Sequence, residues 1–392
     1  MNILYHTYEK VHSTKGGTER TTITMAMALK RLYDAKCFSI YEASADTPKE
    51  ECFVKEFLWS PHKKLEKDIQ MLREIIVANR IDCVIVQGSF IHVKIFKKAV
   101  DGLKCKVILA HHFEPGSERV FFTFKSILKA RTNSLKGLLK KMIRIIIFPY
   151  LRKKYLNDLS HLYHEAYVHA DKVVLLSERL IAPYLKFCNF NNTEKFSIIP
   201  NALSFKNEIT KEAYQTKKKI ALIVSRLDDK HKNISEALKI WNTIKKNKLA
   251  QEWKLKIVGQ GVDEAKYKKY VNTNKIADIS FIGRQNPIPF YKEASIFIMT
   301  SKSESWGLTL TEAQQMGCVP IAYNTYPTLT DIITDGEDGM VIDKNDMANY
   351  EQKLLELMTN RKKRNQLAIQ GIKNCKQFSQ DKIAEMWWKL LT

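Results

Sequence analysis

The sequence predicts an α/β protein made of two doubly wound domains, and three observations lead to this fold class. Short apolar runs rich in valine and isoleucine alternate with longer amphipathic runs along the whole chain. Strands that are apolar on both faces are typical of parallel sheets with helices on both sides. The alternation starts again near residue 219, after a polar, lysine-rich stretch that predicts a linker. A length of 392 residues also exceeds that of one ordinary domain.

The elements follow in chain order. Strands are expected at residues 3–5, 83–86, 107–110, 173–176 and 197–199, and then at 220–224, 255–258, 280–282, 296–299, 319–322 and 340–342. Helical patterns lie between them, among others at residues 18–32, 65–78, 235–245 and 347–358, and an amphipathic segment at 381–391 ends the chain. Two doubly wound domains imply a cleft between them, at the carboxyl ends of the strands.

The composition fits a globular chain that does not cross a membrane. It is 45% hydrophobic and 10% aromatic, which is enough to fill two cores. No stretch approaches the roughly 20 apolar residues that span a bilayer, and because the N-terminus begins directly with a strand we expect no signal peptide. The seven scattered cysteines form no C-x-x-C pair, so we expect free thiols in a reducing cytosol.

The net charge of +22 indicates an anionic partner, and half of the excess lies in one segment. Residues 119–157 hold 11 basic residues and no acidic one, interleaved with aliphatic residues and with phenylalanines such as Phe121. Basic amphipathic helices of this kind lie on anionic membranes. The alternative is a packed helical hairpin with a solvated basic face. No nucleic-acid motif accompanies the charge, so we expect no nucleic-acid partner.

Two polar loops in the second half have the chemistry of a phosphate site. In the first, Glu304 lies on a loop after a strand, and Glu312 lies in the helix that begins after Gly307. The free amides of a helix start suit a pyrophosphate, and two carboxylates can hold sugar hydroxyls. In the second loop, Arg226 and Lys232 can neutralise a leaving diphosphate. Taken alone, both loops could also be ordinary solvated loops.

Two further signals lie in the first half. Gly16 and Gly17, after Lys15, stand at a helix start where a phosphate can approach the backbone, although a lone Gly-Gly pair is weak. His111 and His112 end a strand, where a histidine can face the cleft or merely be solvated. No D-x-D motif and no metal-type spacing of His, Cys or Asp occurs, so we expect no metal.

Taken in this order, the motifs resemble the family-4 retaining glycosyltransferases of the GT-B fold, of the bacterial polysaccharide and lipopolysaccharide type. Glu304 and Glu312 match the family's E-x7-E motif, although Ser305 stands where the family often has glycine. The match is close over residues 219–345 and only an outline over 35–190. The resemblance implies two Rossmann-like domains: residues 1–200 for the acceptor, joined by a returning C-terminal helix at 378–392, and residues 201–377 for the donor.

The resemblance also implies site residues. His112, preferred over His111 for its spacing to Pro115, is expected to act in catalysis together with Glu304, Arg226 and Lys232. The expected donor-binding residues are Gly16, Gly17, Arg226, Lys232, Gly259, Gly283, Arg284, Glu304, Trp306, Gly307, Leu308, Thr309 and Glu312.

The implied reaction is transfer of a hexosyl unit, with retention and without a metal or other cofactor, from a nucleotide sugar. UDP is favoured over GDP, and the acceptor is a glycan or lipid-linked glycan at the inner face of the cell membrane. A nucleotide-sugar epimerase or a sugar phosphorylase of the same fold is the alternative. A nicotinamide-dependent oxidoreductase is disfavoured, because no G-x-G-x-x-G follows the first strand.

Overall fold

The protein consists of two compact units, each built on one parallel sheet. The computed structural model describes residues 1–12, 16–43, 47–61, 64–87, 90–120, 122–129, 134–206, 209 and 216–392. Unit 1 comprises Met1–Pro200 and Met386–Thr392, and unit 2 comprises Asn201–Glu385. Lys15 and Phe121 of the sequence motifs lie outside the described residues.

Unit 1 contains a seven-stranded sheet of order β3-β2-β1-β4-β5-β6-β7, in which all paired strands are parallel. The strands are β1 (Asn2–Glu9), β2 (Lys36–Ala43), β3 (Phe53–Leu58), β4 (Cys83–Gln87), β5 (Lys106–His111), β6 (Lys172–Leu175) and β7 (Phe196–Ile198). Its helices are α1 (Gly17–Tyr33), α2 (Leu65–Ala78), η1 (Phe90–His92), α3 (Val93–Ala99), η2 (Ser117–Val120), α4 (Phe124–Lys129), α5 (Leu135–Ile146), α6 (Phe148–His169), η3 (Glu178–Leu180) and α7 (Ile181–Cys188).

Unit 2 contains a six-stranded parallel sheet of order β10-β9-β8-β11-β12-β13. The strands are β8 (Lys218–Val224), β9 (Lys254–Val258), β10 (Ile279–Gly283), β11 (Ala294–Met299), β12 (Val319–Asn324) and β13 (Met340–Asp343). The helices are α9 (Ile234–Ile244), η4 (Lys248–Ala250), α10 (Glu264–Thr273), α11 (Ile288–Glu293), α12 (Leu308–Gln315), α13 (Leu329–Ile332), α14 (Met347–Thr359), α15 (Arg361–Asn374) and η5 (Cys375–Phe378). Helix α16 (Gln380–Leu391) begins in unit 2 and ends in unit 1. Helices α9, α10, α14 and α15 contribute to an apolar core around the buried Trp241 and Trp253.

Both sheets are doubly wound, because the strand order reverses once in each. The reversal lies between β1 and β4 in unit 1 and between β8 and β11 in unit 2. In unit 2, Val224 pairs with Val258 and Gly283 also pairs with Val258, so these strands end side by side. The loops that follow them therefore leave the same edge of the sheet, which is where ligands bind in such folds.

The predicted fold class is confirmed, including the return of the C-terminal helix to the N-terminal unit. Trp388 of α16 stacks on Tyr33 of α1 with ring centroids 4.4 Å apart, and Lys106 Nζ donates to the carbonyl of Leu391 at 2.9 Å. β2 and β3 are not among the strands predicted from the sequence. In β2, Ser39 and Glu42 interrupt the apolar run, and β3 is an edge strand with a Lys-Glu pair in the middle, so neither has the continuous apolar pattern of a buried strand.

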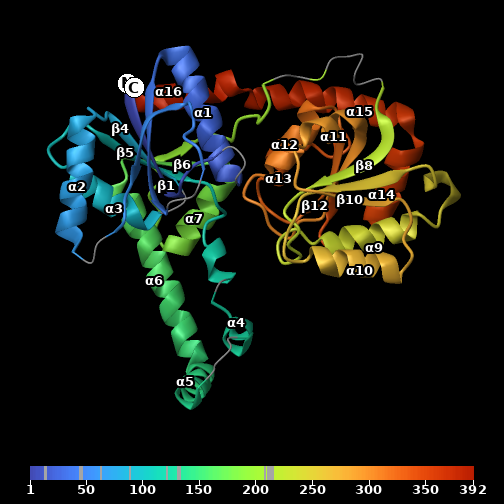
Figure 1. Ribbon diagram of the computed structural model, residues 1–392, viewed down its shortest axis with the longest axis horizontal. Helices are drawn as coiled ribbons and strands as arrows, with labels where there is room; N and C mark the ends of the chain where they lie inside the picture. Colours follow the sequence, from blue (N-terminus) through green and yellow to red (C-terminus); the bar gives the residue numbers. More distant parts are fainter. Residues whose placement is uncertain are drawn as a thin grey trace. The chain divides into compact units, whose positions relative to one another are not determined.

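The basic segment forms the part of unit 1 that extends away from its sheet. Figure 1 shows the 22-residue helix α6 projecting from the sheet, with α4 and α5 at its far end. Within the described parts of the chain, no helix combines the length and the apolar character that a membrane span needs. All seven cysteines are free and buried, as predicted.

Candidate functional site

Lys232 and Glu304 meet at the point where the strand order of unit 2 reverses. Lys232 lies on the loop after β8 and Glu304 on the loop after β11, and Lys232 Nζ donates to Glu304 Oε1 at 2.5 Å. Ser301 Oγ donates to the same oxygen at 2.7 Å. Only 12% of the Glu304 side chain is exposed, so it is not the solvated surface carboxylate of the alternative interpretation. The two loops thus present one fixed, partly buried pair of charges at the ligand-binding edge of the sheet.

Backbone and hydroxyl contacts hold these two loops together. The amide of Lys302 donates to the carbonyl of His231 at 2.7 Å, and Thr300 Oγ1 donates to the carbonyl of Asn233 at 3.0 Å. Because these contacts join the loops on both sides of the ion pair, its geometry is set before a ligand arrives. Such preorganised charges are what electrostatic catalysis requires.

Arg226 lies on the same loop as Lys232 and directs its charge towards solvent. Its side chain is 66% exposed, and Nη2 is 3.4 Å from Asp228 Oδ2. Asp228 makes its shorter contact with His231 Nδ1, at 2.7 Å. Burial of the Asp228 carboxyl opposes ionisation, but the hydrogen bond from His231 and the nearby cations outweigh it and lower the pKa. The carboxylate is therefore engaged mainly by His231, and Arg226 remains available to an anionic ligand.

Gly307 begins helix α12 in a conformation that other residues rarely adopt. Its φ is +86°, and a Cβ atom here would lie 2.8 Å from the hydroxyl oxygen of Tyr326. Leu308 and Thr309, both half-buried, are the first residues of the helix. The amides of a first helical turn have no acceptor within the helix and carry the positive end of its dipole. This end of α12 therefore suits a phosphate group.

Gly259 and Gly283 bring the ends of β8, β9 and β10 close together. At Gly259, a Cβ atom would lie 1.8 Å from the carbonyl oxygen of Ser225, so only glycine fits. Its amide donates to the carbonyl of Gly283 at 2.8 Å. Gly283 has a φ of +78° with open space around it, and the exposed Arg284 follows. Because Gly283 has no side chain and open space around it, a flat ligand can approach the backbone at this edge of the sheet.

Glu312 and Trp306 lie beneath the loop rather than on its surface. Glu312 is fully buried, and the hydroxyl of Tyr291 donates to its Oε2 at 3.0 Å. The Trp306 ring is 2% exposed and packs edge-on against Phe378, with centroids 5.2 Å apart. These two side chains support the start of α12 from inside the unit.

In unit 1, the two histidines at the end of β5 differ in their partners. His111 Nε2 lies 3.4 Å from the hydroxyl of Tyr163, which donates to the Glu118 carboxylate. Both ring nitrogens of His112 are buried and have no hydrogen-bond partner among the described residues. Burial lowers the pKa of His112 to about 4, and burial together with the neighbouring His112 lowers that of His111 to about 3. Both rings are therefore neutral at pH 7, and His112 has the unused polar atoms.

Gly16 and Gly17 occupy the same kind of position in unit 1 that Gly307 occupies in unit 2. Gly17 is the first residue of α1, and both glycines are exposed. Gly16 caps the helix with an extended backbone conformation. Their amides are thus available to an anion at the carboxyl end of β1.

The match to known proteins decides the family. Residues 204–374 match the family described as glycosyl transferases group 1. Over these residues the chain is a group 1 glycosyltransferase. An uncharacterized glycosyltransferase of Haemophilus influenzae is 27% identical over 387 residues, which is 96% of each protein.

Solved structures agree with the GT-B fold of this glycosyltransferase. Anabaena HepE in complex with UDP superimposes with a TM-score of 0.72 at 13% identity, over 100% of this chain and 99% of that one. The apo form of the lipopolysaccharide outer core galactosyltransferase WaaB gives a TM-score of 0.68 at 16% identity, over 99% and 98%. At these identities the likeness establishes the fold alone.

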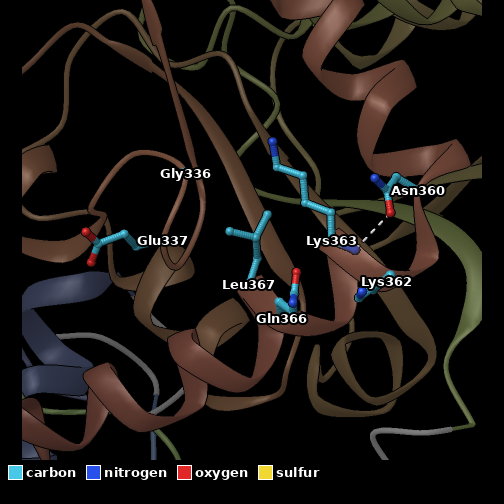
Figure 2. A pocket seen from close by; sticks show the side chains of 7 residues that line it. All are labelled: Gly336, Glu337, Asn360, Lys362, Lys363, Gln366 and Leu367. Carbon is cyan, nitrogen blue, oxygen red and sulfur yellow. Dashed lines mark hydrogen bonds between the residues drawn. The ribbon is translucent and has the colours of Figure 1, made fainter.

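Two cavities in unit 2 of the glycosyltransferase are lined by residues other than the predicted ones. One, of about 510 Å³, lies beside the loop that carries Glu304 and is lined by residues such as Lys239, Lys302 and Lys344. The other, of about 390 Å³, is shown in Figure 2 between Gly336 and the start of α15, where the amide of Lys363 donates to Asn360 Oδ1 at 2.9 Å. Neither lining includes a residue predicted to bind the donor.

Among the described residues of the glycosyltransferase, one cluster of ligand-type side chains was not predicted from the sequence. His6, Glu42 and His92 come together in unit 1, with one potential ligand atom of each within 4.8 Å of the others. No motif could have predicted this cluster, because the three residues lie on β1, on β2 and after β4. Only the order of the strands brings them together.

Proposed function

We propose that this glycosyltransferase transfers a hexosyl unit from a UDP-sugar to a glycan or lipid-linked acceptor, with retention of configuration, in the synthesis of a cell-surface polysaccharide or lipopolysaccharide. The observation that carries the proposal is the Lys232–Glu304 pair at the reversal point of unit 2, beside Arg226 and the start of α12. The UDP bound to HepE and the lipopolysaccharide substrate of WaaB support the choice of donor base and acceptor class.

The donor diphosphate lies across the charged edge of unit 2. Arg226 and Lys232 supply two cations, and the amides of Leu308 and Thr309 supply donors from the start of α12. Negative charge grows on the diphosphate as the bond from the anomeric carbon to the phosphate oxygen breaks. Fixed cations and amides stabilise this charge and take the place that a metal ion has in other enzymes.

Glu304 orients the donor hexose by accepting hydrogen bonds from its hydroxyls. Its Oε1 is already held by Lys232 and Ser301, which fixes the direction of the carboxylate. For Glu312 and Trp306 we propose an indirect role, because both side chains are buried beneath the loop. They hold the start of α12 in place for the nucleotide, while Gly259, Gly283 and Arg284 border the base.

The acceptor hydroxyl attacks the anomeric carbon from the face on which the diphosphate leaves. Its proton passes to the departing phosphate oxygen, so the new bond forms on the same face and the configuration is retained. His112 positions the reacting sugar through one of its unused ring nitrogens, and the amides of Gly16 and Gly17 contribute to diphosphate binding. Among the described residues, Glu304 is bound to Lys232 and Glu312 is buried, so the two do not form the carboxylate pair of a retaining glycosidase. This favours the front-face route over a covalent intermediate.

The acceptor is proposed to be membrane-bound because of α5. This helix has no buried residue, and its apolar stripe includes Leu135, which is 86% exposed, and Ile146, which is 76% exposed. Lys136, Lys140 and Arg144 repeat every four residues on another face. A stripe of exposed aliphatic side chains flanked by cations matches the surface of an anionic bilayer. Helix α5 thus favours peripheral membrane contact over the packed hairpin.

A nucleotide-sugar epimerase or a sugar phosphorylase remains the rival within the same fold. A transferase releases UDP from the donor only when the acceptor is present, apart from slow hydrolysis. An epimerase forms a second nucleotide sugar, or releases UDP, without any acceptor. A coupled assay for UDP with and without a lipid-linked glycan separates these reactions.

The donor site is tested by a thermal shift with UDP, GDP, ADP and their sugars, in the wild type and in Lys232→Gln. A ligand at about 100 times its Kd stabilises the folded protein by about 2.7 kcal/mol, a shift that is easily measured. We expect a shift with UDP that Lys232→Gln weakens and the matched control Lys239→Gln, in the 510 Å³ cavity, leaves intact. A shift abolished by Lys239→Gln would move the nucleotide to that cavity, and a GDP-only shift would change the donor.

A further inference from the structure

The reversal point of unit 1 contains a cluster of two histidines and one glutamate that the transfer reaction does not use. His6 lies on β1, Glu42 near the end of β2, and His92 at the end of η1 directly after β4. These strands are neighbours in the order β2-β1-β4. The reversal between β1 and β4 is where doubly wound sheets open a crevice for ligands.

Two distances within the cluster fit a coordination sphere as well as a hydrogen bond. His92 Nε2 lies 3.0 Å from Glu42 Oε1, and His6 Nε2 lies 3.2 Å from the same oxygen. A zinc ion with bonds of about 2.0–2.1 Å to nitrogen and oxygen places two tetrahedral ligands about 3.3 Å apart. Two imidazoles and one carboxylate are also the protein ligands of many zinc sites that keep a fourth position open.

Each imidazole is able to offer Nε2 to a metal ion. Both Nδ1 atoms are buried and have no hydrogen-bond partner among the described residues. A donor on Nδ1 would fix the proton on Nε2 and prevent coordination, and no described group does this.

Aromatic rings surround the cluster and limit its contact with water. Trp59 packs edge-on against His6 and His92, with centroids 5.5 and 4.9 Å away, and the Phe96 ring lies 5.1 Å from His6. The side chain of His6 is 0% exposed, that of Glu42 11% and that of His92 10%. An apolar shell of this kind strengthens the attraction between a carboxylate and a cation.

We propose that His6, Glu42 and His92 bind one divalent transition-metal ion, of which zinc has the best-matched chemistry. The ion joins β1, β2 and the segment after β4 and stabilises the reversal point of unit 1. It lies in the other unit from Arg226 and Lys232, so it is distinct from the charges assigned to the leaving diphosphate. The alternative is a trio held by hydrogen bonds alone, in which both imidazoles donate to Glu42.

The test is zinc binding by the full-length protein after chelation, measured by elemental analysis and by competition with a chromophoric chelator. Glu42→Gln keeps the shape and one acceptor of the side chain, and His92→Gln removes a second ligand. His169→Gln is the matched control, because His169 also lies beside a carboxylate, that of Glu165 at 3.6 Å, but on the helix surface. Circular dichroism of each chelated protein checks that the fold is intact.

We expect one zinc ion per chain in the wild type and in His169→Gln, and an affinity at least about 10–100-fold lower in each cluster variant. Saturating zinc raises the melting temperature of the wild type by about 5 °C or more. Wild-type protein that binds no zinc, or variants that bind it equally, would overturn the proposal.

Cobalt gives a second measurement that needs no variant. Co²⁺ in a site of nitrogen and oxygen ligands with tetrahedral geometry shows visible d–d bands without a thiolate charge-transfer band. The seven buried cysteines are the competing ligands in this chain. A thiolate band would place the metal at a cysteine and would contradict the assignment to His6, Glu42 and His92.

Discussion

At the scale of single residues, the proposed donor site depends on charges that are fixed to different degrees. Lys232 and Glu304 are partly buried and bound to each other, whereas the guanidinium of Arg226 is two-thirds exposed. A group that is already paired contributes mainly a fixed geometry. An exposed cation gains its main partner only when an anionic ligand binds, so its removal should reduce catalysis more than stability.

We expect Arg226→Ala to lower kcat by about 10²–10³-fold with little change in the melting temperature, because it removes a cation that stabilises the leaving diphosphate. Steady-state kinetics at saturating donor and acceptor measure the effect. Arg361→Ala, an exposed arginine at the start of α15, is the control. A kcat for Arg226→Ala within about threefold of the wild type would remove Arg226 from the mechanism.

The two histidines at the end of β5, His111 and His112, predict a loss of stability in mild acid. Burial lowers the pKa of His112 from the ordinary 6.5 to about 4, so the unfolded chain binds protons more readily than the folded one. Stability is therefore complete above pH 6.5 and falls as the pH drops towards 4. For His112 alone the loss between pH 7 and pH 5 is about 2 kcal/mol.

Urea unfolding at pH 7 and pH 5 measures this loss. His112→Gln should show a smaller difference between the two pH values than the wild type, and His169→Gln, on the surface of α6, should not. An equal pH dependence in His112→Gln would mean that His112 has the same pKa in the folded and the unfolded protein.

At the scale of elements, two strand ends of unit 2 require glycine for different reasons. Gly259 lies too close to a neighbouring carbonyl for a side chain, whereas Gly283 only has a positive φ. We expect Gly259→Ala to destabilise the protein by at least about 3 kcal/mol, because its Cβ would lie 1.8 Å from a carbonyl oxygen of the neighbouring loop. Gly283→Ala meets open space and has only the strain of its positive φ, about 1–2 kcal/mol. Thermal unfolding compares the two, and equal losses would contradict the argument from close approach.

The second element-scale prediction concerns α5. Removing three charges with Lys136→Gln, Lys140→Gln and Arg144→Gln should weaken binding to anionic vesicles about 100-fold, at roughly 1 kcal/mol for each basic residue. Co-sedimentation at low and high salt measures it. Glutamine at the exposed Lys246, Lys248 and Lys275 is the control with the same change of net charge. If wild-type protein does not bind anionic vesicles at low salt, α5 has another partner.

The elements also show where pattern alone succeeds. The predicted helix at residues 65–78 coincides with α2, and every predicted strand overlaps an observed one, because a buried parallel strand is apolar on both faces. β3 is the edge strand of its sheet and is mostly exposed, and β2 beside it is interrupted by Ser39 and Glu42, so both sequences are mixed. An edge position is a property of the sheet and leaves little trace in a short run of residues.

At the scale of the whole molecule, the same strand order occurs twice, and polar or charged side chains from different strands and loops meet at each reversal point. In unit 2 it brings together Lys232 and Glu304, and in unit 1 it brings together His6, Glu42 and His92. The shared order explains why the motifs follow strand ends in both halves. It also explains why each unit offers a separate binding edge.

The sequence by itself determined the α/β class, the restart of the pattern near residue 219, the family resemblance and the loops that carry the charged motifs. These features are local, because periodicity and strand–loop–helix order are written in neighbouring residues. Only the tertiary structure decided that Lys232 meets Glu304 across 72 positions, that Glu312 and Trp306 are buried, and that the apolar stripe of α5 is uncovered. The physical reason is that burial and long-range contact depend on which strands become neighbours, and the order of strands in a sheet is not their order in the chain.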